Sequence, residues 1–395
     1  MGYYKIVFIA GARPNFMKIA PIVKALERRR QGGEGRGGNL QVRIVHTGQH
    51  YDANMSGIFF RELGIPRPDY NLNVGSGSHA EQTAKVMVAF EKVLLKDRPD
   101  LVVVVGDVNS TIACSLTAKK LGVPVAHVEA GLRSFDMGMP EEINRILTDR
   151  ISDLLFVTEE SGIRNLKNEG VPDDRVHFVG NVMIDTLLEN LQRIDTGDWQ
   201  PSEGIRELVD SFEDYAVLTL HRPSNVDRKE TFAPVWRVIS DVGRRIPIIF
   251  PVHPRTRAKM EEFGLSVENV RTIEPIGYMD MLWAVRGAKM VLTDSGGLQE
   301  ETTVLGVPCV TIRENTERPS TIEIGTNYLA GTDPEKILSI ANEILGGEEQ
   351  SRVQRPESRG EEQSKVQSPE GKKGRIPPLW DGKAAERIVE ILIKV

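Results

Sequence analysis

Short apolar segments alternate with segments of helical spacing along this 395-residue chain, and the alternation occurs twice. Several apolar segments, such as Leu101–Val105, are nearly continuous runs of Val, Ile and Leu. Strands buried on both faces have this composition, which is typical of a parallel sheet covered by helices. The sequence therefore predicts an α/β fold with two Rossmann-like, doubly wound parallel-sheet domains. The expected strands are Lys5–Ala10, Val42–His46, Leu101–Val105, Val123–His127 and Leu154–Thr158, then Ala216–Leu220, Ile246–Phe250, Val270–Ile273, Met290–Thr293 and Pro308–Thr311.

The same alternation gives the domain boundaries. We place the first domain at residues 1–185 and the second at 186–376. Residues 346–374 contain only two apolar side chains besides glycine and proline, so they are expected to be a disordered insertion. Residues 28–38 are rich in Gly and Arg, and we interpret them as a solvated loop, with an anion-binding arm as the alternative. An amphipathic helix is expected within 377–395.

The composition excludes several function classes. With 50 basic and 56 acidic residues the net charge is −6, so no global positive field attracts nucleic acid. No segment approaches 18 apolar residues, and we expect no membrane span. The apolar segment Lys5–Ala10 is not followed by a signal cleavage site. The two cysteines, Cys114 and Cys309, lie in apolar surroundings, which predicts a cytoplasmic protein without disulfides.

Two cations follow the first expected strand. Ligands of open α/β sheets bind at the carboxyl ends of the strands, so residues at these positions carry the functional prediction. Arg13 lies in the turn after the strand, and Lys18 lies in the first turn of the next helix. Backbone N–H groups at a helix N-terminus already face an anion, and the two cations therefore suit a phosphate. The alternative is a pair of ordinary surface residues.

Three carboxylates follow the next strands. Asp107 comes after the third strand, Glu129 after the fourth, and Glu141 begins the helix beyond. Asp107 could instead cap its helix, and Glu141 could favour the helix dipole, but Glu129 has no such local role. Clustered carboxylates raise one another's pKa and can hold a proton near neutrality. This arrangement suits general acid–base catalysis.

Polar residues also follow strands of the second half. His221 opens the loop HRPSN and is predicted to lie in a site, whereas we interpret His253 as structural. Ser295, Gly296 and Gly297 lie between a strand and a helix, where bare glycines let a phosphate approach and Ser295 supplies a hydroxyl. Glu301, further along that helix, is placed to bind a ribose diol, and Arg318 adds another cation.

Several cofactor motifs are absent from the sequence. No G-x-G-x-x-G follows the first strand and no G-x-x-x-x-G-K-[ST] occurs, which argues against nicotinamide, flavin and P-loop sites. The His and Cys residues do not have metal-ligand spacing. Basic residues are not interleaved with aromatic ones as in nucleic-acid-binding proteins. We therefore expect no cofactor, no metal and no nucleic-acid partner.

Eight motifs together resemble the non-hydrolysing UDP-N-acetylglucosamine 2-epimerase family. They occur in the family's order and span roughly residues 1–332, with a closing segment LWDGKAAERI. The resemblance implies the glycosyltransferase-B architecture, in which two Rossmann-like domains face across a cleft and the last helix, here in 377–395, returns to the N-terminal domain. It also implies a homodimeric isomerase that acts on a UDP-sugar. The motifs are GARPNFMK, TGQHYD, VVGDVNST, HVEAGLRS, MPEEINR, HRPSN, TDSGGLQEE and TERPSTIEIGTN.

The resemblance implies a role for each residue at a matching motif position. Asp107, Glu129 and Glu141 are similar to the family's catalytic carboxylates, which Arg145 accompanies, and His221 is similar to its active-site histidine near the diphosphate. The implied substrate contacts are Arg13 and Lys18 for the phosphates, Ser295, Gly296 and Gly297 for the phosphate cradle, Glu301 for the ribose, Arg318 on the sugar side, and the backbone of Met281 for the uracil.

The implied reaction interconverts UDP-N-acetylglucosamine and UDP-N-acetylmannosamine. UDP is eliminated across C1–C2 of the sugar to give 2-acetamidoglucal, and it then adds back with hydrogen on the other face of C2. One carboxylate removes the C2 proton and another acid returns it, and the sequence leaves open which does which. Cationic groups and a helix N-terminus stabilise the charge that builds on the departing diphosphate.

Four other functions stay open at this point. A close relative of the family acts on UDP-2,3-diacetamido-glucuronic acid, and a hydrolysing relative would release UDP and free N-acetylmannosamine. A retaining glycosyltransferase would need an acceptor site, and a nucleotide-sugar sensor would have lost some carboxylates.

Gln49 and His50 resemble residues of family members that are regulated by their own substrate at a second site. Those members often have a further Gln where this chain has Asp52.

Overall fold

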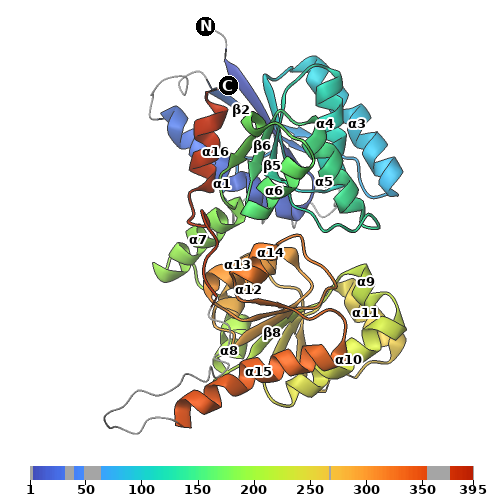
Figure 1. Cartoon of the computed structure of the whole chain (residues 1–395), viewed down its shortest axis with the longest axis vertical. Coiled ribbons are helices and arrows are strands. Elements are labelled where there is room, and N and C mark those ends of the chain that lie inside the picture. Colours follow the sequence, from blue (N-terminus) through green and yellow to red (C-terminus); the bar gives the residue numbers. More distant parts are fainter. Residues whose placement is uncertain (1–2, 32–39, 49–63, 267, 354–373, 395) are drawn as a thin grey trace. The chain divides into compact units, whose positions relative to one another are not determined.

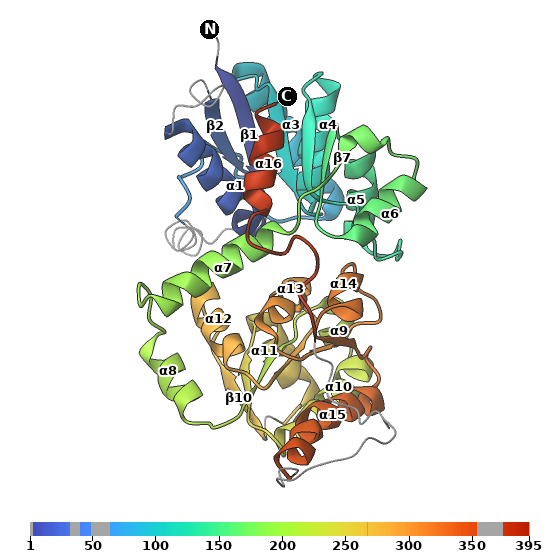
Figure 2. The same ribbon diagram turned by 60° about the vertical axis from the view of Figure 1, so that its left-hand side comes forward.

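The chain folds into two compact units, Met1–Glu189 with Pro378–Val395, and Asn190–Pro377. The computed structural model describes residues 3–31, 40–48, 64–266, 268–353 and 374–394. Each unit has one parallel sheet with helices on both faces (Figures 1 and 2), which confirms the predicted fold class. Among the described residues, no helix is both long enough and apolar enough to cross a membrane.

The sheet of the first unit has seven parallel strands in the order β3-β2-β1-β4-β5-β6-β7. In β1, Val7 and Ile9 pack with α3 and α4, while the alternate residues Ile6 and Phe8 are equally buried. Helices α1 and α16 lie side by side (Figure 1). The elements are β1 Tyr4–Ala10, α1 Arg13–Gln31, β2 Leu40–His46, β3 Tyr70–Asn71, α3 His79–Lys96, β4 Leu101–Val105, α4 Asn109–Lys120, β5 Val125–Ala130, α5 Pro140–Ile151, β6 Leu154–Val157, α6 Glu160–Asn168, β7 Val176–Phe178, α7 Val182–Asp195 and α16 Ala384–Leu392.

The sheet of the second unit has six parallel strands in the order β10-β9-β8-β11-β12-β13. Ala216 and Leu218 of β8 pack with α10 and α15, and Val217 between them packs with α12 and α13 on the other face. The elements are α8 Glu203–Asp210, β8 Ala216–Thr219, α9 Pro223–Val226, α10 Lys229–Gly243, β9 Ile248–Pro251, α11 Pro254–Phe263, β10 Val270–Ile273, α12 Tyr278–Arg286, β11 Met290–Thr293, α13 Gly296–Leu305, β12 Cys309–Thr311, α14 Pro319–Glu323, β13 Asn327–Leu329 and α15 Pro334–Val353.

Some sequence expectations differ from these elements. The fourth expected strand was placed at Val123–His127, but β5 runs from Val125 to Ala130 and therefore includes Glu129. Helix α15 runs from Pro334 to Val353 and so continues into the segment 346–374, for which disorder is expected from composition. A helix that has already formed gains one backbone hydrogen bond for each residue added to its end. The rest of that segment to residue 373 and most of the 28–38 loop, from residue 32, lie outside the described residues.

The segment 378–395 is fixed to the first unit by several specific contacts. Asp185 accepts hydrogen bonds from the first N–H groups of α16, at 3.1 and 2.7 Å. The indole of Trp380 is buried and donates to the carbonyl of Thr158 at 2.9 Å. Gly180 has a φ of +86°, and a Cβ there would lie 2.0 Å from the carbonyl oxygen of Leu379. Only glycine at position 180 allows this approach.

Candidate active site

Glu129 has the most unusual backbone of the predicted site residues. Its φ is +73°, and the register between β5 and β6 shifts between Val128 and Ala130, which marks a bulge. A positive φ is rare for a residue with a side chain, and such strain and bulges cluster at functional sites. The Glu129 carboxylate is 4% exposed and forms an ion pair with Lys18 of α1. The bulge thus aims a buried carboxylate at a buried ammonium group.

Asn15 and Gly106 place Lys18 beside the β4–α4 turn. The Asn15 side chain accepts hydrogen bonds from the N–H groups of Gly11–Ala12, at 3.1 and 2.8 Å, and donates to the carbonyl of Val105 at 3.1 Å. These bonds connect the start of α1 to the end of β4. Gly106 has a φ of +67°, and a Cβ there would lie 3.1 Å from Lys18 Nζ. The glycine therefore leaves room for the ammonium group next to Asp107.

Arg145 links Asp107 to the loop that precedes α5. Its guanidinium donates to Asp107 Oδ2 at 2.6 Å and to Glu142 Oε2 at 2.7 Å. Glu142 is buried and also accepts the backbone N–H groups of Ser134 and Phe135, both at 2.9 Å. The neighbouring Glu141 was the predicted residue, and Glu142 was not predicted. The buried carboxylate that holds this loop and orients Arg145 is Glu142.

Three predicted residues or motifs of the first unit stand apart from these contacts. Glu141 lies in the first turn of α5, partly exposed, and its side chain forms no hydrogen bond or ion pair with any described residue. Arg13 begins α1, but its side chain lies outside the described part of the chain. Gln49 and His50 also lie outside the described residues. The structure therefore brings together Lys18, Glu129, the Asp107 turn and Arg145.

In the second unit, Asp294 orients His221. The Nδ1 atom of His221 lies 2.9 Å from Asp294 Oδ1, and the other Asp294 oxygen accepts the backbone N–H groups of His221 and Arg222, at 2.9 and 2.8 Å. Burial alone would raise the pKa of Asp294, but the hydrogen bond and charge of His221 and the two backbone N–H groups lower it. An ionised carboxylate at Nδ1 leaves Nε2 of the half-exposed imidazole for a ligand.

The N-terminus of α13 follows β11. Ser295 is the N-cap residue, and no described side chain makes a capping hydrogen bond there, so the first-turn N–H groups suit an anion. The two glycines differ. A Cβ at Gly297 would meet no atom within 4 Å, whereas a Cβ at Gly296 would lie 2.6 Å from an Arg318 nitrogen. The absence of a side chain at Gly296 thus lets the Arg318 guanidinium approach, the space at Gly297 is open, and a phosphate at these glycines stays a prediction.

Three arginines gather beside this helix end. Arg318 donates to Glu300 at 2.7 Å and to Glu317 at 3.2 Å, and Arg313 donates to Glu317 through two bonds of 2.9 and 2.7 Å. The pKa of Arg222 is lowered by burial and then by the charge of Arg313. Guanidinium groups at a helix N-terminus suit a diphosphate. Arg318 was among the predicted site residues, whereas Arg222 was not, although it belongs to the HRPSN motif.

The two remaining predicted contacts lie on α13 and α12. Glu301 is buried beside Tyr278, whose pKa is raised by burial and then by the Glu301 charge. The backbone N–H of Met281 donates to the carbonyl of Gly277 at 3.0 Å, and the Met281 side chain packs against the core. This N–H is thus used within the helix, and the expected contact of the Met281 backbone with a uracil stays a prediction.

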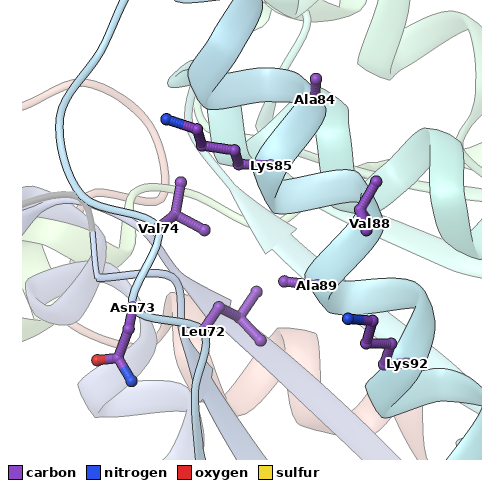
Figure 3. A pocket seen from close by; sticks show the side chains of 8 residues that line it. All are labelled: Leu72, Asn73, Val74, Ala84, Lys85, Val88, Ala89 and Lys92. Carbon is purple, nitrogen blue, oxygen red and sulfur yellow. The ribbon is translucent and has the colours of Figure 1, made fainter.

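A groove of about 550 Å³ lies on the first unit between the segment 72–74 and α3 (Figure 3). None of the predicted site residues lines it, so it is separate from the candidate active site. Within the described ranges, no group of three or more His, Cys, Asp or Glu side chains is arranged to hold a metal ion. The groove is lined by Leu72, Asn73, Val74, Ala84, Lys85, Val88, Ala89 and Lys92.

Known proteins resemble this chain over nearly its whole length. The family model for UDP-N-acetylglucosamine 2-epimerase matches residues 35–393. The UDP-N-acetylglucosamine 2-epimerase of Methanocaldococcus jannaschii is 42% identical, with 98% of each chain covered. The UDP-2,3-diacetamido-2,3-dideoxy-D-glucuronate 2-epimerase of Pseudomonas aeruginosa is 43% identical, with 87% of this chain and 92% of the relative covered. A crystal structure of the M. jannaschii enzyme with UDP-GlcNAc and UDP has a TM-score of 0.83 and 43% identity, and covers 99% of this chain and 100% of that chain. This chain therefore belongs to the UDP-N-acetylglucosamine 2-epimerase family, as its motifs predicted.

Proposed function

We propose that the protein is a non-hydrolysing 2-epimerase that interconverts UDP-N-acetylglucosamine and UDP-N-acetylmannosamine. The observation that carries the proposal is the strained, buried Glu129 carboxylate, paired with Lys18 beside the Asp107 turn, in a chain of this family. A second candidate substrate is UDP-2,3-diacetamido-glucuronic acid, because a relative named for the 2-epimerisation of that sugar is 43% identical to this chain.

Each part of the arrangement has a chemical use in this reaction. The open N-terminus of α13, with Gly297 and the nearby arginines, suits the diphosphate, whose negative charge grows as the C1–O bond breaks. His221, oriented by Asp294, can donate or accept a hydrogen bond at that group. Asp107 and Glu129 supply the carboxylates that remove the C2 proton and return one to the other face. Glu301 is proposed to hold the ribose.

We also propose that the enzyme is a cytoplasmic homodimer. Val88 and Leu95, seven residues apart on α3, are 58% and 70% exposed, and Val88 lines the groove of Figure 3. Residues at this spacing share one helix face, and a second copy could cover them. Cys114 and Cys309 are buried free thiols, as in a reducing compartment.

Proton NMR in D2O tests the reaction. We expect deuterium at C2 in a mixture of UDP-N-acetylglucosamine and UDP-N-acetylmannosamine when the protein is incubated with either. Free N-acetylmannosamine plus UDP would indicate a hydrolysing enzyme instead. Exchange only with UDP-2,3-diacetamido-glucuronic acid would establish the second candidate. If neither sugar nucleotide exchanges deuterium, the epimerase proposal is wrong.

Two conservative variants test the catalytic carboxylates. Asp107→Asn and Glu129→Gln should each slow C2 exchange at least about 100-fold, because the amide neither takes nor returns a proton. UDP affinity, measured by calorimetry, should stay within about twofold. Glu160→Gln, an exposed carboxylate on α6, is the control and should keep full exchange. Loss of UDP binding in Asp107→Asn or Glu129→Gln would instead make these residues structural.

A further inference from the structure

We propose that the buried pair of Asp149 and His127 is a positioning device that holds Glu129 and the Gly106–Asp107 turn in their reactive geometry. The proposal rests on the epimerase function and adds two positioning residues to it. Both side chains are completely buried, so neither touches a substrate. Their effect must therefore pass through the backbone that they hold.

Asp149 holds the strand on both sides of Glu129. One of its oxygens lies 2.6 Å from Nδ1 of His127, two residues before Glu129. The other accepts the N–H of Gly131, two residues after Glu129, at 3.0 Å, and an Arg133 nitrogen at 2.7 Å. A single carboxylate on α5 thus fixes both ends of the bulge that aims Glu129 at Lys18.

His127 extends this hold to the other carboxylate. Its Nε2 lies 2.8 Å from the carbonyl oxygen of Gly106, the residue before Asp107. A carbonyl only accepts hydrogen bonds, so Nε2 carries a proton, and Nδ1 faces a carboxylate that also accepts. Burial would raise the pKa of Asp149, but the charges and hydrogen bonds of His127 and Arg133 lower it. Both ring nitrogens therefore face an acceptor, so the ring connects the Asp149 carboxylate to the Gly106 carbonyl.

The inner face of α5 serves both carboxylates. Glu142, Arg145 and Asp149 follow one another at spacings of three and four residues, which places them on the same side of a helix, and all three are buried. Arg145 binds the Asp107 side chain, while Asp149 acts through His127 and Gly131 on the backbone around Glu129. One rigid helix thus sets the geometry of both proposed catalytic groups, as a preorganised site requires.

Turnover of the full-length protein tests this role. Asp149→Asn and His127→Gln should lower kcat about 10- to 100-fold, because small displacements of a reacting group have effects of this size. KM and the Kd for UDP should stay within about twofold. His127→Gln, whose NH2 group can still donate to one of the two acceptors, should retain more kcat than His127→Phe, which has no donor.

Asp153→Asn is the matched control. Asp153 accepts the N–H of Val125 at 2.8 Å and the Lys119 ammonium at 2.7 Å, so it holds the opposite end of the same strand. This variant should lower the thermal midpoint but leave kcat within about twofold. If Asp149→Asn keeps the kcat of the unmodified protein, or if kcat falls equally in both variants, the positioning role is wrong.

NMR of the unmodified protein gives a test that does not depend on turnover. With 15N-labelled histidine, His127 should show two ring N–H signals at neutral pH, assigned by their loss in folded His127→Gln. A single ring N–H would show that the ring does not donate to both Asp149 and Gly106, and would overturn the bridge between them. Two N–H signals without any C2 exchange would refute the epimerase function and leave the geometry of the pair intact.

Discussion

At the scale of single residues, Glu129 shows how surrounding contacts hold a residue in a backbone conformation that the residue itself disfavours. A side chain at positive φ costs about 1–3 kcal/mol, and such a conformation persists only where the surroundings over-determine it. Here Asp149 fixes the residues on either side, and the ion pair with Lys18 fixes the carboxylate. The position is therefore maintained by contacts and not by the preference of the residue itself.

This strain predicts an unusual order of stability between two variants. The free energy of unfolding of Glu129→Gly should exceed that of Glu129→Gln by about 1 kcal/mol, because glycine adopts positive φ freely. Glu129→Gly should therefore also unfold at the higher temperature. Both variants lose the carboxylate equally. The measurement is calorimetric unfolding at one pH.

The same two substitutions at Glu141, in the first turn of α5, provide the control. Glycine disfavours a helix, so Glu141→Gln should be more stable than Glu141→Gly there. The idea of strain at Glu129 fails if glycine is also the less stable substitution at position 129.

The sequence indicated which strand ends carry the site, but it did not identify the residues that orient the reactive groups. Asp149 is one of several polar residues on an amphipathic helix, and Asp294 follows a strand as many helix caps do. Their roles depend on partners 22 and 73 residues away, which local spacing does not specify. The signal that could have pointed to Asp149 is the polar face of α5, since Glu142 and Arg145 lie on it too.

At the scale of elements, burial on both faces made the central strands predictable. The apolar runs of β4 and β11 form strands with the expected bounds. The short strands β3, β7 and β13 were not predicted. Each of them lies at an edge of its sheet, where a strand is fixed by one neighbour only.

Asp185 makes the attachment of α16 dependent on pH. Burial, partly offset by the N–H groups of Ala385 and Ala384, raises the pKa of Asp185 to about 6. A carboxyl group whose pKa is raised by folding binds protons more tightly in the folded state, so it adds stability at low pH that is lost as pH rises through 6. Unfolding midpoints of the protein and of Asp185→Asn should therefore be compared from pH 7 to pH 4.5.

The difference in unfolding free energy between the unmodified protein and Asp185→Asn isolates the Asp185 carboxyl. Asparagine does not titrate, and the contributions of the other titratable groups are the same in both proteins. Relative to Asp185→Asn, the unmodified protein should gain about 2 kcal/mol as the pH falls over this range. A difference that stays constant with pH, or that grows in the opposite direction, would show that the pKa of Asp185 is not raised.

At the scale of the whole molecule, the exposed apolar face of α3 predicts how copies associate. We expect sedimentation velocity to show a species of twice the 44.0 kDa chain mass. Replacing Val88 and Leu95 together with Asp should give monomers, because charges would then be buried between the copies. Ile376→Asp changes an apolar residue of the second unit that is 54% exposed, and it serves as the control that stays dimeric. A dimer that survives the α3 changes would place the interface elsewhere.

The division of the first unit into two stretches of chain has a consequence for the order of synthesis. All of its strands are translated before the second unit begins, yet Pro378–Val395 are translated after the second unit ends. A ribosome therefore synthesises every residue of the second unit's core before it makes Trp380 and the helix that packs beside α1. The first unit is complete only after the second unit has been synthesised, and until Leu379 and Trp380 are made the surface at Gly180 lacks its partner.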